Sequence, residues 1–430
     1  MSSYQRGTAT RFAIAEALAQ SAASASAVKK FFHGTHRCKT PARTLDAIRP
    51  FMPIMGITRV ANVTGLDRVG IPVVMVCRPN SRCLAVSQGK GLDLESAKAS
   101  GVMEAIESYH AEHITLPLKF AAYHELRYTH VLADVYSLPI TKTPRFDPFE
   151  PMLWIAGEDL LQRGDVWVPY ASVSTNFTKV GRRVAAGFLA TSNGLASGNC
   201  LLEALSHGIC EVVERDAYQL WQLKSEGHKH DTRLDLDSVD DPDCRELLEK
   251  FGRANMRVEA WDITSDVGIA AFRCVIADNN CNAFHKIPFA GGSGCHPSRS
   301  IALLRSLTEA AQSRLTFIAG SRDDKSRKDH QIMYSDETAQ LAETSKTIDG
   351  GMRHYLRAPD HVSDNILDDV TWELQQLSRA GIERVIAVDL TRKEFGLPVV
   401  RVVVPGLEPH ADPRHYYVGK RARSIWEKTN

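Results

Sequence analysis

Three stretches of the chain place carboxylates at positions that would share one face of a helix. GVMEAIESY carries Glu104 and Glu107, and GICEVVERD carries Glu211 and Glu214. Side chains three residues apart lie side by side on a helix, so each pair brings together like charges that repel unless a cation lies between them. In LLRSLTEAAQSRL, Glu309 occupies the equivalent position. The same acid position therefore recurs in three separate segments.

These acids have a simpler interpretation, a solvated stripe with salt bridges along each helix. Their recurrence on three helices favours a shared centre, where several carboxylates cannot all ionise without cations. Mg²⁺ prefers carboxylates, waters and substrate phosphates as ligands. Arg215 and Arg305 lie on the same helices and could hold phosphate oxygens by charge-assisted hydrogen bonds. The pattern thus predicts a centre for Mg²⁺ and a phosphate-bearing ligand.

The elements that would position these acids also repeat. Three segments read as a β-branched strand, a polar turn and a second apolar strand: 58–77, 256–278 and 383–405. Acid-bearing helices are expected near 95–112, 200–220 and 299–318, and further helices at 244–255 and 368–381. The spacing is too long and irregular for a solenoid. We therefore predict an α+β fold, a pseudo-repeated core of strand pairs and acidic-faced helices around a nucleotide site.

Glycine-rich stretches precede all three acidic helices, at 87–97, 191–199 and 290–300. Glycine permits close approach of the backbone, and helix N-termini attract anions. Neither a G-x-x-x-x-G-K-[ST] loop nor a G-x-G-x-x-G fingerprint after a strand is present. A nucleotide would therefore bind through metal and acid, in a site unlike a P-loop.

Composition narrows the class of protein. Lys and Arg number 52 against 51 Asp and Glu, so no overall field draws the chain to nucleic acid or to a membrane surface. The longest apolar runs have the length of strands, so no membrane span is expected. The nine cysteines are scattered without a C-x-x-C pair, which favours reduced thiols in a cytoplasmic protein.

The remaining motifs carry less chemistry. The histidine pairs HGTH, HAEH and HKH are expected at the surface. Residues 139–150, 227–243 and 321–350 are expected to be loops or mobile covers, with the charged segment 227–243 poor in helix. The Ser- and Ala-rich N-terminus faintly suggests a transit peptide, but an N-terminal helix that docks on its own domain is the commoner explanation.

Three blocks carry a family resemblance: SGVMEAIES, SNGLASGNCLLEALSHGICEVVERD and GGSGCHPSRSIALLRSLTEAAQSRLTFIAGSRDD. They resemble the signature blocks of the YcaO superfamily, in order, and the match runs from about residue 35 to about 405. GITRVANVTGLDRVGIPVVMVCRPNSRCLAVSQGKG is most similar to the branch associated with the partner protein TfuA. We therefore expect an N-terminal helical extension (1–34), a YcaO-like catalytic domain (35–410) and a C-terminal tail (411–430).

The resemblance also implies a site for ATP and Mg²⁺. The metal-binding residues that it implies are Glu104, Glu107, Glu203, Glu211, Glu214 and Glu309. The ATP-binding residues are Arg37, Thr44, Lys90, Ser100, Glu104, Asn199, Glu203, Glu214, Arg215, Arg305 and Glu309. No residue is singled out as a general base.

Two departures from the family pattern bear on activity. Ser108 stands where many relatives carry an Arg after the second Glu, so one phosphate contact is missing or supplied elsewhere. The C-terminus, YYVGKRARSIWEKTN, lacks the P-x-P-x-P tail of many azoline-forming relatives, in which that tail reaches toward the active site. Its absence suits the thioamide-forming branch better.

The activity that the resemblance implies is phosphorylation of a peptide amide oxygen by ATP, which creates a leaving group. Sulfur addition would give a thioamide, the outcome that we expect, with a TfuA-like partner, a precursor peptide and a sulfur donor. Addition of a Cys, Ser or Thr side chain would give an azoline. A non-catalytic scaffold and a di-metal hydrolase are the alternatives from other classes. A homodimer is expected from the family.

Overall fold

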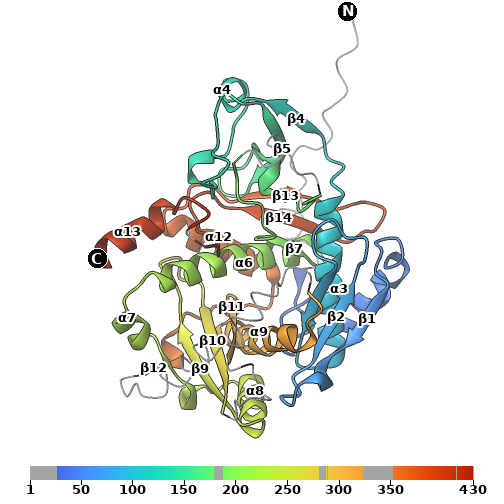
Figure 1. The fold of residues 1–430 in the computed structure, drawn as a ribbon, viewed down its shortest axis with the longest axis vertical. Helices are drawn as coiled ribbons and strands as arrows, with labels where there is room; N and C mark the ends of the chain where they lie inside the picture. The colour runs from blue at the N-terminus through green and yellow to red at the C-terminus, as the bar shows by residue number, and fades with distance from the viewer. Residues whose placement is uncertain are drawn as a thin grey trace, which may run out of the picture.

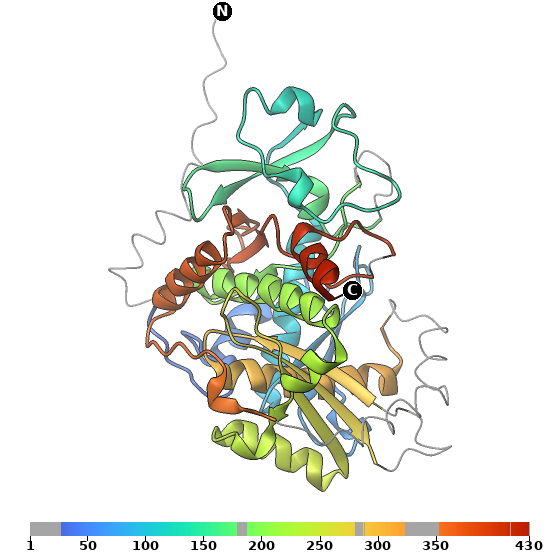
Figure 2. The ribbon, with the colours of Figure 1, turned by 90° about the vertical axis from the view of Figure 1, so that its left-hand side faces the viewer.

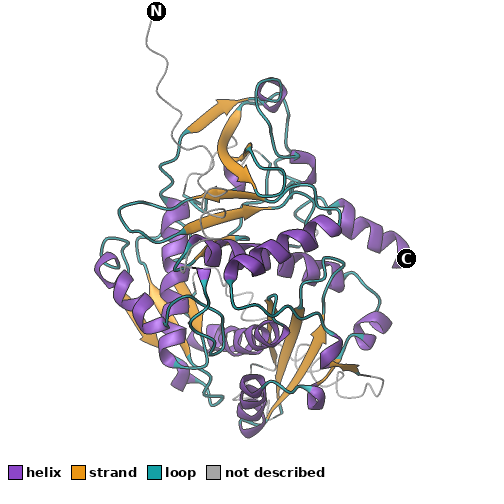
Figure 3. Ribbon diagram, turned by 180° about the vertical axis from the view of Figure 1, so that it is seen from behind, coloured by secondary structure: helices purple, strands orange, loops and turns teal. Residues whose placement is uncertain are grey.

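The computed structural model describes residues 27–178, 187–279, 287, 289–322, 352–412 and 414–429. Within them the chain has an α+β fold, as predicted, whose core is three similar units of three antiparallel strands and one long helix (Figure 1). The long helices lie toward the middle of the molecule, and the strands lie around them. The same arrangement is seen from behind, with helices purple and strands orange (Figure 3).

In the first two units the strands and the helix are consecutive elements. The first unit consists of β1 (Arg59–Asn62), β2 (Val73–Cys77), β3 (Val86–Lys90) and α3 (Leu94–Glu112). The second consists of β9 (Met256–Asp262), β10 (Ala271–Asp278), β11 (Phe289–Cys295) and α9 (Arg299–Ala319). In each, the middle strand pairs antiparallel with both neighbours. The predicted strand pairs and acidic helices of both units are confirmed, and each pair gains a third strand.

The third unit is assembled from two distant parts of the chain. Its third strand and helix are β7 (Leu195–Ser197) and α6 (Leu201–Gln222), and its strand pair is β13 (Ile386–Asp389) and β14 (Val399–Val403). β14 pairs antiparallel with β7, with Val400 opposite Ala196. The strand pair predicted near the C-terminus therefore belongs with the acidic helix predicted near 200–220.

The sheet of the third unit continues into a lobe that the sequence did not predict. Three further strands extend it: β4 (Leu118–Ala121), β5 (Met152–Asp159) and β6 (Asp165–Pro169). The order is β4-β5-β13-β14-β7, with β6 also paired to β5. This lobe stands at the top of Figure 1 and lies above the long helices in Figure 2 as well. The Trp154 indole is fully buried there and donates to the Ala121 carbonyl at 3.0 Å.

Glycines let the long helices lie directly on the third strands. A Cβ at Gly89 of β3 would stand 2.0 Å from the Ala97 carbonyl oxygen of α3. A Cβ at Gly294 of β11 would stand 2.2 Å from the Ala302 carbonyl oxygen of α9. No side chain fits at such distances, so glycine is required at both positions. The glycine-rich stretches before α3 and α9 are thus strands that pack against the helices, as well as approaches to the helix N-termini.

The other elements complete the layers around this core. They are α2 (Pro41–Ile48), α4 (Tyr123–Leu126), α7 (Glu226–Asp231), β8 (Leu234–Asp235), α8 (Pro242–Arg253), β12 (Arg353–His354), α12 (Ile366–Arg379) and α13 (Lys420–Thr429). The expectation that 227–243 is poor in helix was wrong at its start, because Ser225 caps α7 by accepting a hydrogen bond from the His228 amide. Most of the segment 321–350 lies outside the described residues.

The structure describes most of the C-terminal segment but little of the N-terminal one, so the two predictions for the chain ends are tested unequally. The helix expected within residues 1–34 falls mostly on residues 1–26, which lie outside the described residues. The expected tail, 411–430, contains α13, which packs against α6 through an ion pair between Arg421 and Asp216. In the part of the chain that the structure describes, no helix combines the length and apolar character needed to cross a bilayer.

Candidate functional site

A cavity of about 590 Å³ lies among α3, α6, α9 and the segment before α2. All thirteen residues predicted to bind ATP or metal line it. They are Arg37, Thr44, Lys90, Ser100, Glu104, Glu107, Asn199, Glu203, Glu211, Glu214, Arg215, Arg305 and Glu309. The acids of three helices therefore meet at one centre, which argues against the interpretation as a solvated stripe. Their individual roles as ligands stay predictions.

The acids of α6 are held by an arginine on the same helix. The Arg215 guanidinium lies 3.0 Å from Glu214 and 3.9 Å from Glu211. The Ser293 hydroxyl, at the end of β11, donates to Glu214 at 2.9 Å. A serine of the second unit thus orients a carboxylate of the third, a contact between units that the sequence did not reveal.

The acid of α9 forms an ion pair across the cavity. Lys90, at the end of β3, donates to Glu309 at 2.8 Å, and the Ser293 amide donates to its other oxygen at 3.3 Å. Burial alone would raise the pKa of Glu309, but Lys90 and Arg215 lower it to about 2. Glu309 is therefore a carboxylate at neutral pH, and the Lys90 ammonium is its present partner.

At Glu104, Glu107 and Glu211, burial outweighs the stabilisation that neighbouring cations and hydrogen bonds give to the ionised form. Burial raises the pKa of Glu107 to about 8, although the Ser197 amide and hydroxyl donate to it at 2.9 and 2.7 Å. Burial and the neighbouring Glu214 raise the pKa of Glu211 to about 7, and burial also raises the pKa of Glu104. These shifts mean that the ionised forms need a cation in the centre. Carboxylate oxygens of this kind fit Mg²⁺.

Glu203 belongs to a separate group of hydrogen bonds at the start of α6. It accepts from the Cys38 amide at 2.6 Å, and from the Asn199 amide and side chain at 2.8 and 3.0 Å. Asn199 in turn accepts from the Thr44 hydroxyl at 2.8 Å. This network joins the segment that carries Arg37 and Thr44 to α6. Glu203 is therefore held by amide donors, whereas Glu214 and Glu309 are held by cationic side chains.

Two cavity residues outside the predicted set bear on charge. His207 of α6 accepts from Arg305 at 3.0 Å if its Nε2 is unprotonated, and burial together with Arg305 lowers its pKa well below the usual range. It stands at the helix position equivalent to Ser100 and Arg305, which is the signal that could have revealed it. Arg322, after α9, lowers the pKa of Glu104, so this part of the cavity has a cation although Ser108 provides none.

Arg401 lies on β14 beneath the acids of α6. Its side chain is 3% exposed, and neither Nε nor Nη1 has a hydrogen-bond partner among the described residues. Burial lowers the pKa of Arg401 to about 10, and the charge of Glu211 opposes that shift. A buried guanidinium, two of whose nitrogens have no hydrogen-bond partner among the described residues, therefore lies near enough to Glu211 to interact with its charge.

The expectation that the histidine pairs lie at the surface was wrong for HAEH. His110 of α3 is 1% exposed, because the last turn of α3 packs against Phe395, whose ring centroid lies 5.7 Å from that of His110. Its Nδ1 lies 2.8 Å from the Ile106 carbonyl oxygen. Periodicity alone did not separate this buried face from the exposed one.

Comparisons with known proteins identify a family and several relatives. Residues 88–408 match the family described as YcaO cyclodehydratase, ATP- and Mg²⁺-binding. A protein of Rhizobium leguminosarum bv. trifolii, named for its place in the tfuA 3′ region, is 38% identical over 394 residues, which cover 90% of this chain and 92% of that one. A protein of Methanothermobacter thermautotrophicus is 35% identical over 397 residues, 89% of this chain and 98% of that one.

Solved structures share the fold. YcaO from Methanopyrus kandleri, bound with AMPPCP and Mg²⁺, has a TM-score of 0.72 and 24% identity, covering 92% of this chain and 99% of that one. A heterocyclase in complex with substrate and cofactor also has a TM-score of 0.72, with 22% identity, and matches 89% of this chain. The chain spans 55% of that heterocyclase.

The fold and the acidic centre define a protein of the YcaO class. The chain belongs to the YcaO family and, by its similarity to the tfuA-region protein, to the TfuA-associated branch. Its cofactors are ATP and Mg²⁺, which the family binds. The residues present fit them, because the cavity combines six glutamates with cationic side chains that include Lys90, Arg215 and Arg305.

Proposed function

We propose that this protein uses ATP and Mg²⁺ to activate a peptide backbone amide by phosphorylating its oxygen, and that a TfuA-like partner then directs formation of a thioamide. The observation that carries the activation step is the meeting of Glu104, Glu107, Glu211, Glu214 and Glu309 in one cavity with cationic side chains. The similarity to a protein of the tfuA region supports the partner and the product.

The chain's residues divide into those that would hold Mg²⁺ and those that would hold phosphate. Bound ATP and Mg²⁺ supply the phosphoryl group and neutralise its charge. The acids of α3, α6 and α9 would hold the metal. Arg215, which now pairs with Glu214 at 3.0 Å, and Lys90, which pairs with Glu309 at 2.8 Å, would exchange part of these contacts for phosphate oxygens.

The nucleotide would be oriented from the N-terminal side of α6. Arg37, Thr44 and Asn199 line the same cavity, and the hydrogen bond of 2.8 Å from Thr44 to Asn199 fixes two of them. Arg305 remains available for phosphate because its hydrogen-bond partner, His207, is a neutral ring. Positioning and charge neutralisation are thus the chain's contributions to the reaction.

The C-terminus supports the thioamide over the azoline. No described residue of 411–429 lines the cavity, and α13 lies against α6 through the ion pair between Arg421 and Asp216. The tail therefore occupies a different place from one that reaches toward the active site.

The test is a reconstitution with the TfuA-like partner, a candidate precursor peptide, ATP, Mg²⁺ and sulfide. A peptide mass gain of about 16 Da, oxygen replaced by sulfur, is the expected result, because the activated amide oxygen leaves as phosphate. Glu214→Gln, which removes one acid of the centre, should abolish the gain, whereas Glu226→Gln on the exposed helix α7 should not. ATP cleavage that does not depend on peptide would contradict the proposal.

A second candidate is an azoline-forming cyclodehydratase, which the family description and the likeness to a heterocyclase favour. This reaction uses the same activation of the amide, but the peptide loses about 18 Da, the mass of one water, and no sulfide is required. Nucleotide binding with no turnover in either assay would instead indicate a scaffold. We also propose a homodimer and a cytoplasmic location, which size-exclusion chromatography with light scattering and cell fractionation would test.

A further inference from the structure

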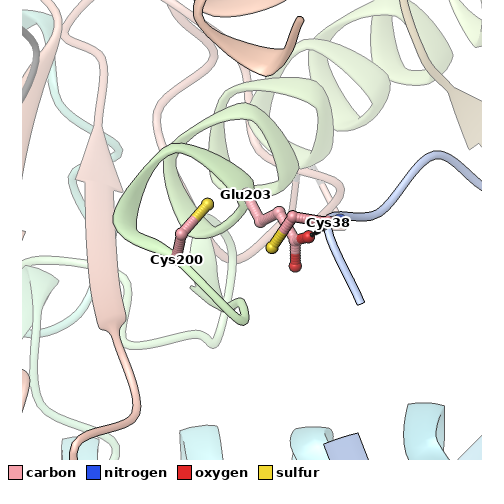
Figure 4. Close-up of side chains that lie close together, drawn as sticks. All are labelled: Cys38, Cys200 and Glu203. Atoms are coloured by element: carbon pink, nitrogen blue, oxygen red, sulfur yellow. Dashed lines mark hydrogen bonds between the residues drawn. The ribbon is translucent and has the colours of Figure 1, made fainter. Parts of the chain in front are cut away.

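Two cysteines and a glutamate gather at the start of α6, beside the acidic centre. The Sγ atoms of Cys38 and Cys200 and a carboxylate oxygen of Glu203 all lie within 4.8 Å of one another. Figure 4 shows the Cys38 thiol between the other two side chains. Cys38 comes from the segment before α2, Cys200 is the N-cap residue of α6 and Glu203 lies in its first turn, so the fold brings these three together.

Backbone and side-chain contacts hold this arrangement in place. The Cys38 amide donates to Glu203 at 2.6 Å, which fixes the Cys38 side chain beside the carboxylate. Asn199 donates to the other Glu203 oxygen through its amide and its side chain. Carboxylates that bind metals commonly have such supporting hydrogen bonds, which set their orientation.

Cys200 occupies the N-cap of α6 but makes no side-chain hydrogen bond to the helix. Serine, threonine and aspartate are preferred there because their oxygens accept from the first free amides. A thiol in this place is a poor cap. The positive end of the helix instead favours a thiolate, which is the form that binds metals.

The accessibility of the three side chains suits an ion. Glu203 and Cys38 are buried at 1% and 9% exposure, while Cys200 is partly exposed and gives a path from solvent. Two thiolates and a carboxylate are ligands for Zn²⁺, which takes sulfur and oxygen in tetrahedral sites. Mg²⁺ prefers oxygen alone, so the group is chemically distinct from the acidic centre.

We propose that Cys38, Cys200 and Glu203 form a binding site for Zn²⁺, with the fourth position open to water. The ion replaces the thiol protons, which are released to solvent. Zn²⁺ also takes as a ligand the Glu203 carboxylate, which otherwise accepts hydrogen bonds from Asn199. Zn²⁺ therefore weakens nucleotide binding at the adjacent cavity, a consequence that rests on the proposed function, whereas the zinc site itself does not.

The site is tested on the full-length chain, kept reduced with a phosphine and freed of metal. Zn²⁺ binding is measured by competition with a chromophoric chelator. Cys38→Ser and Cys200→Ser should each weaken the tightest site by about tenfold or more, since each removes a ligand. Cys77→Ser, which alters a partly exposed thiol on β2, serves as the matched control and should retain it. Equal zinc affinity in all four proteins would overturn the proposal.

Cobalt provides a readout that misfolding cannot imitate. Co²⁺ bound to the wild type should show thiolate charge-transfer absorption, which each of the two cysteine substitutions should reduce while leaving the far-ultraviolet circular dichroism unchanged. A Co²⁺ spectrum without that absorption would also overturn the site. Magnesium-dependent ATP binding, measured without zinc, tests the proposed function separately: its absence would contradict that function and leave the zinc result intact.

Discussion

Burial of Glu211 and Glu107 beside other acids is unfavourable for the folded protein when no metal is bound. The pKa of Glu211 is raised to about 7, above its value in an unfolded chain. The folded state therefore retains the proton longer, and this carboxyl stabilises less and less as the pH rises from about 4.5 through 7. At pH 8 its ionised form is opposed by burial and by Glu214.

We predict that Glu211→Gln raises the unfolding free energy of the metal-free protein at pH 8 by about 1 kcal/mol, because it removes a poorly compensated charge. Mg²⁺ should stabilise the wild type but not this variant. Glu203→Gln is the matched comparison and should have the opposite sign, losing about 1–3 kcal/mol, since it turns an amide group toward the N–H donors of Cys38 and Asn199. Urea unfolding with and without Mg²⁺ measures both. Equal effects of the two substitutions would contradict this account.

His110 gives a second prediction at the residue scale. Burial lowers its pKa to about 4, and its Nε2 has no hydrogen-bond partner among the described residues. The unfolded chain therefore takes up the proton first, and stability falls as the pH decreases from about 6.5 toward 4. Between pH 7 and pH 5 the wild type should lose about 2 kcal/mol more than His110→Phe.

Denaturant midpoints at the two pH values measure this difference. His113→Phe, at the C-cap of α3, keeps His110 and should retain the wild-type response. If His110→Phe responds to acid as the wild type does, the buried neutral ring is not the cause.

At this scale the sequence predicted every acid of the centre but few of their partners. The recurrence of one acid position on three helices was enough to predict that Glu104, Glu211 and Glu309 meet at one centre. Ser197 and Ser293 were not predicted, because each donates to an acid of another unit. Such contacts depend on how the units pack, which no local pattern records.

At the scale of elements, the third strands explain why glycine is abundant before α3 and α9. The sequence predicted the β-branched strand pairs, but VSQGK and FAGGSGC lack the side chains that are typical of strands, and these segments become β3 and β11. Because glycine has no side chain, these strands can lie directly against the long helices. The pairing of β7 with β14 was also beyond prediction, because these strands are far apart in the sequence.

We predict that Gly294→Ala destabilises the protein by about 2 kcal/mol or more, since the new Cβ would meet the Ala302 carbonyl and the backbone of Ser306 and would push α9 away from β11. That movement also displaces Arg305, whose Cβ would lie 2.7 Å from the new methyl group. Nucleotide affinity should fall together with stability.

Gly252→Ala in α8 is the matched control for Gly294→Ala. Nothing lies within 4 Å of a Cβ at Gly252, and alanine has the higher helix propensity, so this change should be neutral or stabilise by up to about 1 kcal/mol. Thermal unfolding and nucleotide titration measure both variants. A Gly294→Ala protein as stable as Gly252→Ala would show that helix and strand can separate at little cost.

At the scale of the whole molecule, α6 connects the centre to the C-terminus. Its cavity side carries Glu211, Glu214 and Arg215, while the next residue, Asp216, is fully buried on the other side. There Asp216 accepts from Arg421 at 3.0 and 3.2 Å and from the Glu408 amide at 2.9 Å. The last helix among the described residues is therefore fixed to α6, which carries three of the acids that line the cavity.

We predict that Arg421→Met lowers the unfolding free energy by about 3 kcal/mol, because it leaves the Asp216 carboxylate buried without its countercharge. Adding Asp216→Asn should restore much of the loss, since an amide keeps an acceptor for the Glu408 amide and carries no charge. Arg423→Met, on the exposed side of α13, should change stability little. Because Arg421 does not line the cavity, the ATP affinity of the folded Arg421→Met protein should stay within about twofold of the wild type. A loss of ATP affinity at a temperature where the variant is folded would mean that the tail acts on the centre through α6.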